Sequence, residues 1–116
     1  IVNVSSVAGY TGGGGVAYVA SKAAIIGMTK NIAMRCANVN VRCNALCPGS
    51  VVTPMTMGMK KENLDPDMIS AMSKHADLSL PACMPEEVAN AILFLAGDES
   101  SAITGQIIVI DHGADL

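Results

Sequence analysis

The sequence predicts an α/β fold built on a parallel sheet. Three short apolar runs at residues 1–4, 41–47 and 106–110 alternate with stretches that carry helical patterns. These runs are mostly apolar, whereas a half-exposed strand would alternate apolar and polar residues. Such runs are typical of parallel strands that helices cover on both faces. The 116 residues suffice for one small domain. Because three strands make a small sheet with exposed flanks, we expect further strands on its N-terminal side.

The first half of the chain predicts two strands with a loop and a long helix between them. Residues 1–4 form a β-type run that ends at a pair of serines. Five glycines between residues 9 and 15 predict a loop. Small residues from 17 to 37 then predict a helix with one apolar face. Residues 41–47 form the second strand, which Pro48-Gly49 ends.

The second half predicts shorter elements. Residues 50–80 indicate a mobile segment with one helix near residues 67–75. Pro85 in a first helical turn, two glutamates after it and Gly97 past the last turn predict a helix of about twelve residues. Met84 takes its N-cap position, where an oxygen-bearing side chain would be better by about 1 kcal/mol. The last apolar run follows as the third strand.

Composition excludes several classes of protein. With 51% hydrophobic residues and a mean hydropathy of +0.44, the chain is too apolar to be disordered. Only 3% of its residues are aromatic and its net charge is −3, so we expect no nucleic-acid partner. We expect no membrane partner either, because no apolar run approaches the ~20 residues of a span and no basic segment opens a signal peptide.

Four cysteines bear on metal binding and on the cellular compartment. No two of them have the two-residue gap of zinc ribbons or thioredoxin-like motifs. This spacing predicts no metal site. Free thiols fit a reducing compartment, so we expect a cytoplasmic protein.

The candidate chemistry lies in Ser6, Tyr18 and Lys22. Tyr18 and Lys22 are four residues apart on the predicted helix, so their side chains share one face. An ammonium close to a phenol favours the phenolate and suits the phenol to general acid–base work. Chance would produce such a pair on many helices, but here a strand delivers Ser6 at its carboxyl end, where parallel sheets carry their active sites.

Four segments together resemble the C-terminal half of the short-chain dehydrogenase/reductase family. They are the runs NVSSVAG (residues 3–9), YVASKAA (18–24) and CPGSVVTPM (47–55), and finally TGQ (104–106) with DHG (111–113). The resemblance implies that residues 1–116 form the C-terminal part of a doubly wound, parallel-sheet, Rossmann-like domain whose N-terminal half binds most of the cofactor. It also implies an oxidoreductase that uses NAD or NADP to interconvert a secondary alcohol and a ketone.

The resemblance assigns roles residue by residue. Ser6 would hydrogen-bond the substrate oxygen, Tyr18 would exchange its proton, and Lys22 would hold the nicotinamide ribose and favour the Tyr18 phenolate. The nicotinamide and its phosphates would be lined by Pro48, Gly49, Val51 and Thr53. Residues 55–72, with five methionines, correspond to a lid over the substrate. The full-length protein would be a homo-oligomer, a dimer or tetramer.

Two features depart from the family pattern. Ser6 precedes Tyr18 by twelve positions, one fewer than usual, so Ser5 stays an alternative to Ser6; the run after Ser6 favours Ser6. His112 stands where the family has a glycine, and we interpret it as a loop residue in preference to a new catalytic base.

A catalytically inactive, truncated chain that only associates with other chains is the alternative function.

Overall fold

The computed structural model describes residues 1–116, apart from the side chain of Lys61. Its sheet has three strands in the order β1 (Val2–Val4), β2 (Asn44–Pro48) and β3 (Ile107–Ile110). Both pairings are parallel, with Asn3 opposite Ala45 and Leu46 opposite Ile108. The predicted α/β class with a parallel sheet is therefore confirmed.

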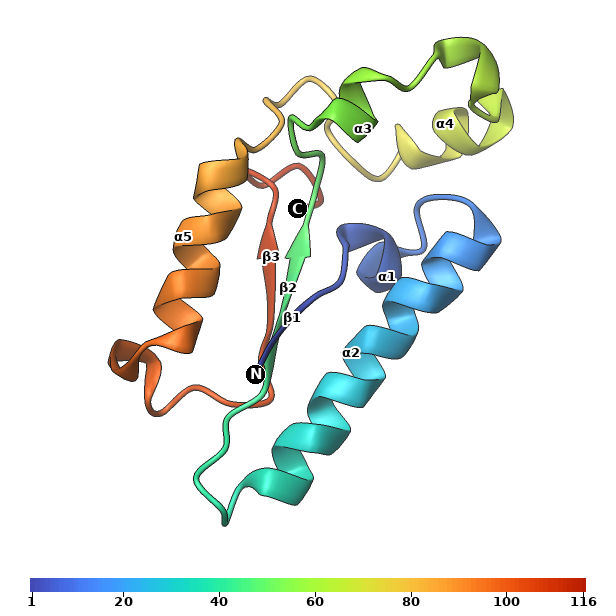
Figure 1. Cartoon of the computed structure of the whole chain (residues 1–116). Helices are drawn as coiled ribbons and strands as arrows, with labels where there is room; N and C mark the ends of the chain where they lie inside the picture. The colour runs from blue at the N-terminus through green and yellow to red at the C-terminus, as the bar shows by residue number, and fades with distance from the viewer.

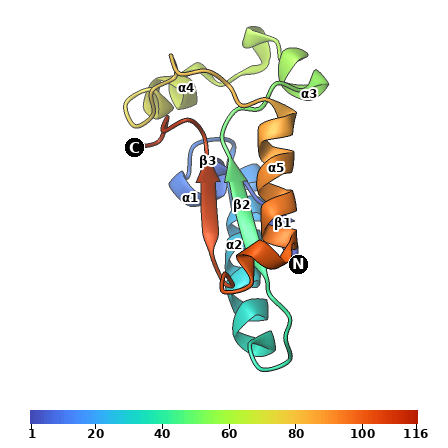
Figure 2. The ribbon, with the colours of Figure 1, turned by 90° about the vertical axis from the view of Figure 1, so that its left-hand side faces the viewer.

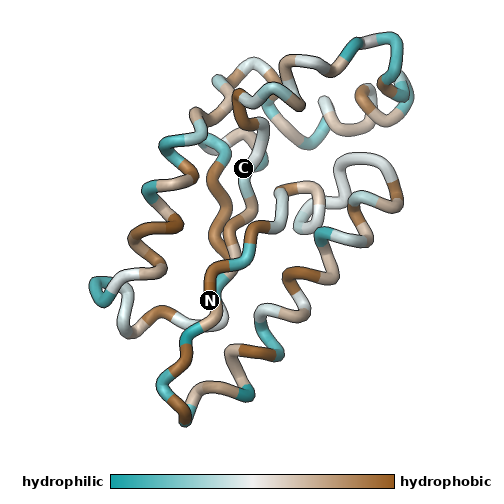
Figure 3. The backbone as a smooth tube through the Cα atoms, viewed as in Figure 1, coloured by the Kyte–Doolittle hydropathy of each residue, from teal (hydrophilic) through white to brown (hydrophobic). Residues whose placement is uncertain are grey.

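Helices cover both faces of the sheet. Helices α1 (Val7–Thr11) and α2 (Val16–Cys36) lie on one face, and α5 (Pro85–Ala96) lies on the other (Figures 1 and 2). The central strand β2 is buried along its whole length. This burial explains why the residues that follow Asn44 in the strand are apolar whichever face they point to. Figure 3 shows the apolar strands enclosed between helices of mixed hydropathy.

The three strands end at one common edge of the sheet, and short helices lie beyond it (Figure 1). These are α3 (Pro54–Met57), the 3-10 helix η1 (Lys61–Asn63) and α4 (Pro66–Met72). The helix expected near residues 67–75 is α4, which ends at Met72 and continues only as a turn. A further 3-10 helix, η2 (Asp98–Ser100), follows α5.

Helix α1 corrects the expectation of a loop at residues 9–15. The Ser6 side chain accepts a hydrogen bond from the Ala8 backbone N–H and caps the helix. The helix ends where Gly12, at φ +86°, takes the left-handed conformation and returns its N–H to the Ala8 carbonyl. The loop is therefore confined to the residues between Thr11 and Val16. In the sequence, Ser6 followed by the apolar residues Val7 and Ala8 could have indicated the start of this helix.

The second strand begins three residues later than predicted. Residue Arg42 donates hydrogen bonds to the carbonyls of Leu95 (3.0 Å), Gly97 (2.8 Å) and Ile103 (3.2 Å). This places a cation at the carbonyl end of α5, which the helix dipole favours. The segment before Asn44 thus packs against the C-terminal end of α5, and the chain joins the sheet only from Asn44 onward.

Within the described part of the chain, no helix is both long and apolar enough to cross a lipid bilayer.

Candidate active site

The carboxyl end of β1 presents two buried serines with different hydrogen bonds. Ser5 donates its N–H to the Leu46 carbonyl (2.7 Å) and its hydroxyl to the Lys22 carbonyl (2.7 Å). The Ser6 hydroxyl accepts from the Ala8 N–H at 3.1 Å, and that is its one bond among the side-chain hydrogen bonds of the described residues. Ser5 thus ties β1 to α2, while the Ser6 hydroxyl keeps its own proton to donate.

Lys22 links α2 to the end of β1. Its Nζ donates to the Val4 carbonyl (3.3 Å) and lies 5.6 Å from the centre of the Tyr18 ring. Both side chains come from α2, one helical turn apart, as the spacing predicted. Tyr18 is 48% exposed, so its ring stands open to a ligand while the ammonium lies over its face.

Glycine at position 9 allows this close approach of α1 to α2. A Cβ at Gly9 would lie 2.5 Å from the Lys22 carbonyl carbon and 2.7 Å from the Ala23 nitrogen. Backbone atoms cannot yield at such distances. The absence of a side chain at Gly9 therefore sets the position of Lys22 against the end of β1.

A cysteine adjoins the same cluster. Burial raises the pKa of the Cys47 thiol, while the Ser5 hydroxyl, the Ser6 backbone N–H and the Lys22 ammonium oppose that shift. Cys47 therefore stays a neutral thiol, and it places the end of β2 beside both serines and Lys22.

The remaining predicted residues follow β2 at the same edge. Pro48 ends the strand, and Gly49 donates its N–H to the Ile110 carbonyl at 2.8 Å. The backbone at Gly49 lies close to Asp111, because a Cβ at Gly49 would be 2.9 Å from Cβ of Asp111. Val51 forms a parallel bridge with Cys83. Thr53 caps α3 through hydrogen bonds with Thr56.

The structure thus gathers the predicted residues on one edge in two groups. Lys22 joins Tyr18 to the strand end that carries Ser5 and Ser6, and the segment from Pro48 to Thr53 leads from there toward α3 and α4 (Figure 1). A shallow hollow of about 450 Å³ is lined by residues 73–78 and Leu116, and none of the predicted site residues lines it.

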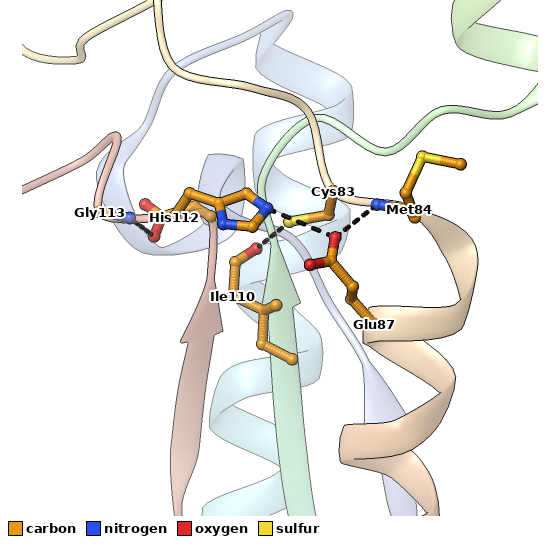
Figure 4. Close-up of polar contacts among 7 residues, drawn as sticks. Cys83, Met84, Glu87, Ile110, His112 and Gly113 are labelled. Carbon is orange, nitrogen blue, oxygen red and sulfur yellow. Dashed lines mark hydrogen bonds and ion pairs between the residues drawn. The ribbon is translucent and has the colours of Figure 1, made fainter.

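A second polar cluster lies at the start of α5 (Figure 4). Glu87 Oε2 accepts from the Met84 N–H (2.7 Å) and pairs with His112 Nε2 (3.3 Å). These contacts lower the pKa of Glu87, with the Met84 hydrogen bond as the largest cause. The buried Cys83 thiol donates to the Ile110 carbonyl (3.4 Å), and its pKa is raised by burial first and then by the charges of Glu87 and Asp111. Cysteine spacing alone could not reveal this grouping.

Known proteins resemble this chain in sequence. The family model described as "Enoyl-(Acyl carrier protein) reductase" matches residues 1–115. The chain is 44% identical to "Short-chain dehydrogenase/reductase cdmF" of Talaromyces verruculosus, over 96% of this chain and 46% of that protein. It is 48% identical to "3-oxoacyl-[acyl-carrier-protein] reductase FabG" of Thermotoga maritima, over 97% of this chain and 44% of that protein.

Solved structures match as well. Two crystal structures of a 3-oxoacyl-[acyl-carrier protein] reductase from Brucella melitensis, the second with bound NAD, give TM-scores of 0.80 and 0.77 at 36% and 35% identity. Each match covers 100% of this chain and respectively 42% and 40% of the solved chains, so the chain spans less than half the length of these proteins. The predicted Rossmann-like α/β fold and the predicted resemblance are confirmed, and the chain belongs to the short-chain dehydrogenase/reductase family.

Proposed function

We propose that this chain carries the acid–base half of an NAD(P)-dependent oxidoreductase that interconverts a secondary alcohol and a ketone. The observation that carries the proposal is the position of the Lys22 ammonium, which lies 5.6 Å from the Tyr18 ring centre and binds the end of the strand that delivers Ser6. In this proposal residues 1–116 are the C-terminal portion of one Rossmann-fold domain. The match to less than half of each relative supports their being part of a longer domain.

Ser6 is the better candidate of the two serines for holding the substrate oxygen. The Ser5 hydroxyl proton is already donated to the Lys22 carbonyl, so Ser5 has a structural duty. The Ser6 hydroxyl accepts from Ala8 and retains its proton. A donor fixed by a helix cap can stabilise the charge that develops on a carbonyl oxygen.

Tyr18 is the proposed proton donor for ketone reduction. Its hydroxyl proton goes to the substrate oxygen as a hydride reaches the carbonyl carbon, and Tyr18 is left as a phenolate. The Lys22 ammonium, 5.6 Å from the centre of the Tyr18 ring, would stabilise that negative charge. In alcohol oxidation the phenolate takes the proton back.

The residues present fit a nicotinamide cofactor. Lys22 uses one of its three N–H donors on the Val4 carbonyl, so the others remain for ribose hydroxyls. The segment with Pro48, Gly49, Val51 and Thr53 would line the nicotinamide, which supplies the hydride when bound. NAD and NADP are both compatible with this half of the site, and the substrate is a small-molecule alcohol or ketone.

The full-length protein is proposed to be a homo-oligomer, a dimer or tetramer, that pairs through α2. Small residues give this helix a shallow outer surface, on which another helix can approach closely. Light scattering of the full-length protein at micromolar concentration tests this, and a monomer would contradict it.

Replacing the phenol tests the proposed reaction. In the full-length protein, Tyr18→Phe should lower kcat by at least about 100-fold, which is the usual contribution of a positioned acid or base. The Kd of the cofactor should stay within a few-fold, because the ribose contact belongs to Lys22. Lys22→Ala should weaken both turnover and cofactor binding.

The matched control is Tyr10→Phe, which removes the hydroxyl of the other tyrosine, 65% exposed on α1. Its turnover should be that of the unchanged protein. Normal turnover by Tyr18→Phe would overturn the assignment. A protein that turns over no alcohol or ketone while it still assembles with other chains would favour the alternative, a catalytically inactive member that only associates.

A further inference from the structure

Cys83, Glu87 and His112 form a cluster that the proposed reaction does not use. The Cys83 sulfur, a Glu87 carboxylate oxygen and a His112 ring nitrogen all lie within 4.8 Å of one another. Cys83 is buried, whereas the side chains of Glu87 and His112 are 45% and 37% exposed (Figure 4). We propose that these three side chains bind one zinc ion, with water as the fourth ligand.

The distances suit a tetrahedral ion. Zinc bonds of about 2.0–2.3 Å place neighbouring ligand atoms roughly 3.3–3.8 Å apart. The contact between Glu87 Oε2 and His112 Nε2 is already 3.3 Å. With all three atoms within 4.8 Å, no pair needs to close by more than about 1.5 Å, which side-chain rotations supply.

Backbone contacts hold two of the ligands in place before any ion binds. Cys83 is fixed on both sides by the bridge to Val51, through Cys83 N–H to Ser50 O (2.8 Å) and Val52 N–H to Cys83 O (2.9 Å). The Met84 N–H fixes Glu87 Oε2, and the second lone pair of that oxygen remains for an ion. Outer contacts of this kind orient metal ligands in proteins.

The third ligand, His112, takes a conformation that favours glycine. Its φ is +57°, in the left-handed region that residues with a Cβ disfavour. The turn around it is held by Asp111, whose two carboxylate oxygens accept from the N–H groups of Gly113 and Asp115 (both 2.9 Å). Glycine would relieve this backbone strain but has no imidazole. Binding a metal would therefore explain why a histidine stands at this position.

The donor set selects the metal by its chemistry. One sulfur, one imidazole nitrogen and one carboxylate oxygen suit a borderline-soft ion such as zinc, whereas magnesium and calcium prefer oxygen alone. Binding replaces the Cys83 S–H proton by the metal and releases that proton to water. The thiol then gives up its bond to the Ile110 carbonyl.

This proposed site differs from the expectation from cysteine spacing, which predicted no metal. That expectation rested on ligands close in sequence, whereas these come from a loop, from α5 and from the turn after β3. The proposal does not depend on the oxidoreductase reaction, and its test measures binding alone.

The test titrates Co²⁺ and Zn²⁺ into the untagged protein in its natural length. We expect one equivalent of Co²⁺ to bind with a thiolate-to-cobalt charge-transfer band, and Zn²⁺ to displace it and raise Tm. Cys83→Ala should abolish the band. His112→Gly should raise the Kd of Zn²⁺ by roughly tenfold or more. His112→Gly also relieves the strained φ, so it should fold at least as well as the unchanged protein.

Two control variants carry the same chemical changes elsewhere. Cys36→Ala and His75→Ala remove a cysteine and a histidine outside the cluster, and both should bind as the unchanged protein does. The proposal is overturned if no ion binds, if binding gives no charge-transfer band, or if a folded His112→Gly binds zinc as tightly as before.

Discussion

Ser5 and Ser6 are neighbours in sequence, but their hydroxyls make different hydrogen bonds. The Ser5 hydroxyl joins β1 to the backbone of α2, and the Ser6 hydroxyl caps α1. A sequence motif alone leaves the two interchangeable, because either can be counted as the serine before the tyrosine. The direction of each hydrogen bond separates them, since only Ser6 retains a proton for a substrate.

Substituting each serine in the full-length protein tests this division. Ser6→Ala should lower kcat by on the order of 100-fold, as the loss of an oxyanion donor does. Ser5→Ala should change kcat by only a few-fold and lower the free energy of unfolding by about 1 kcal/mol, the net value of one hydrogen bond. Steady-state kinetics and urea unfolding measure both effects.

The control for Ser6 is threonine, which keeps a hydroxyl and a cap. If Ser6→Thr retains much of the activity that Ser6→Ala loses, the hydroxyl itself matters. The reverse outcome, with Ser5→Ala inactive and Ser6→Ala active, would assign the role to Ser5.

At the scale of elements, the crossing of α1 over α2 depends on Gly9. Its missing side chain lets α1 approach the backbone at Lys22 and Ala23. Gly9→Ala should therefore push the helices apart and lower the free energy of unfolding by about 1–3 kcal/mol, as overpacking does. Because Lys22 would move with α2, turnover should fall as well.

Gly27→Ala is the matched control within α2. A Cβ there meets nothing within 4 Å in this chain, and alanine is the better helix former by about 0.5–1 kcal/mol. Gly27→Ala should thus be neutral or stabilising in chemical unfolding. Equal stability of the Gly9→Ala and Gly27→Ala proteins would show that the close approach at Gly9 is unimportant.

Local signals in the sequence predicted most elements, and long-range contacts account for the differences. The long helix, expected over residues 17–37, is α2 at Val16–Cys36, and the helix bracketed by Pro85 and Gly97 is α5. The start of β2 was wrong because Arg42 binds carbonyls at the far end of α5, and such partners have no local signature.

The candidate site shows the same division. The spacing of Tyr18 and Lys22 placed them on one face of α2, because helix geometry follows from the sequence. The cluster of Cys83, Glu87 and His112 depends on how β3 and α5 pack against a distant loop. Only the folded chain brings those residues together.

At the scale of the whole molecule, the chain exposes more surface than its size requires. Its accessible surface is 7545 Å², whereas a compact monomer of 11.9 kDa exposes about 5,900 Å². Its radius of gyration is 15.2 Å, against about 13 Å for a compact domain of this length. Among the described residues the strand β1 pairs with β2 alone, so its other edge is free for a neighbouring strand. These values support the proposal that further structure packs onto these residues.

The last prediction concerns residues 1–116 produced on their own: they should bind neither NAD nor NADP tightly and should not catalyse hydride transfer. Positioning the cofactor accounts for much of such an enzyme's rate, and the phosphates of dinucleotides are usually held by a glycine-rich turn and a helix N-terminus after a first strand. Ser6, Tyr18 and Lys22 lie at the nicotinamide end of the proposed site, which leaves the adenosine half in water. The free edge of β1 and the many exposed large hydrophobic side chains should also make this protein aggregate. Isothermal titration calorimetry with NAD and NADP measures the affinity, and size-exclusion chromatography measures the assembly. Micromolar binding by a folded monomer would show that these residues hold the cofactor without further structure.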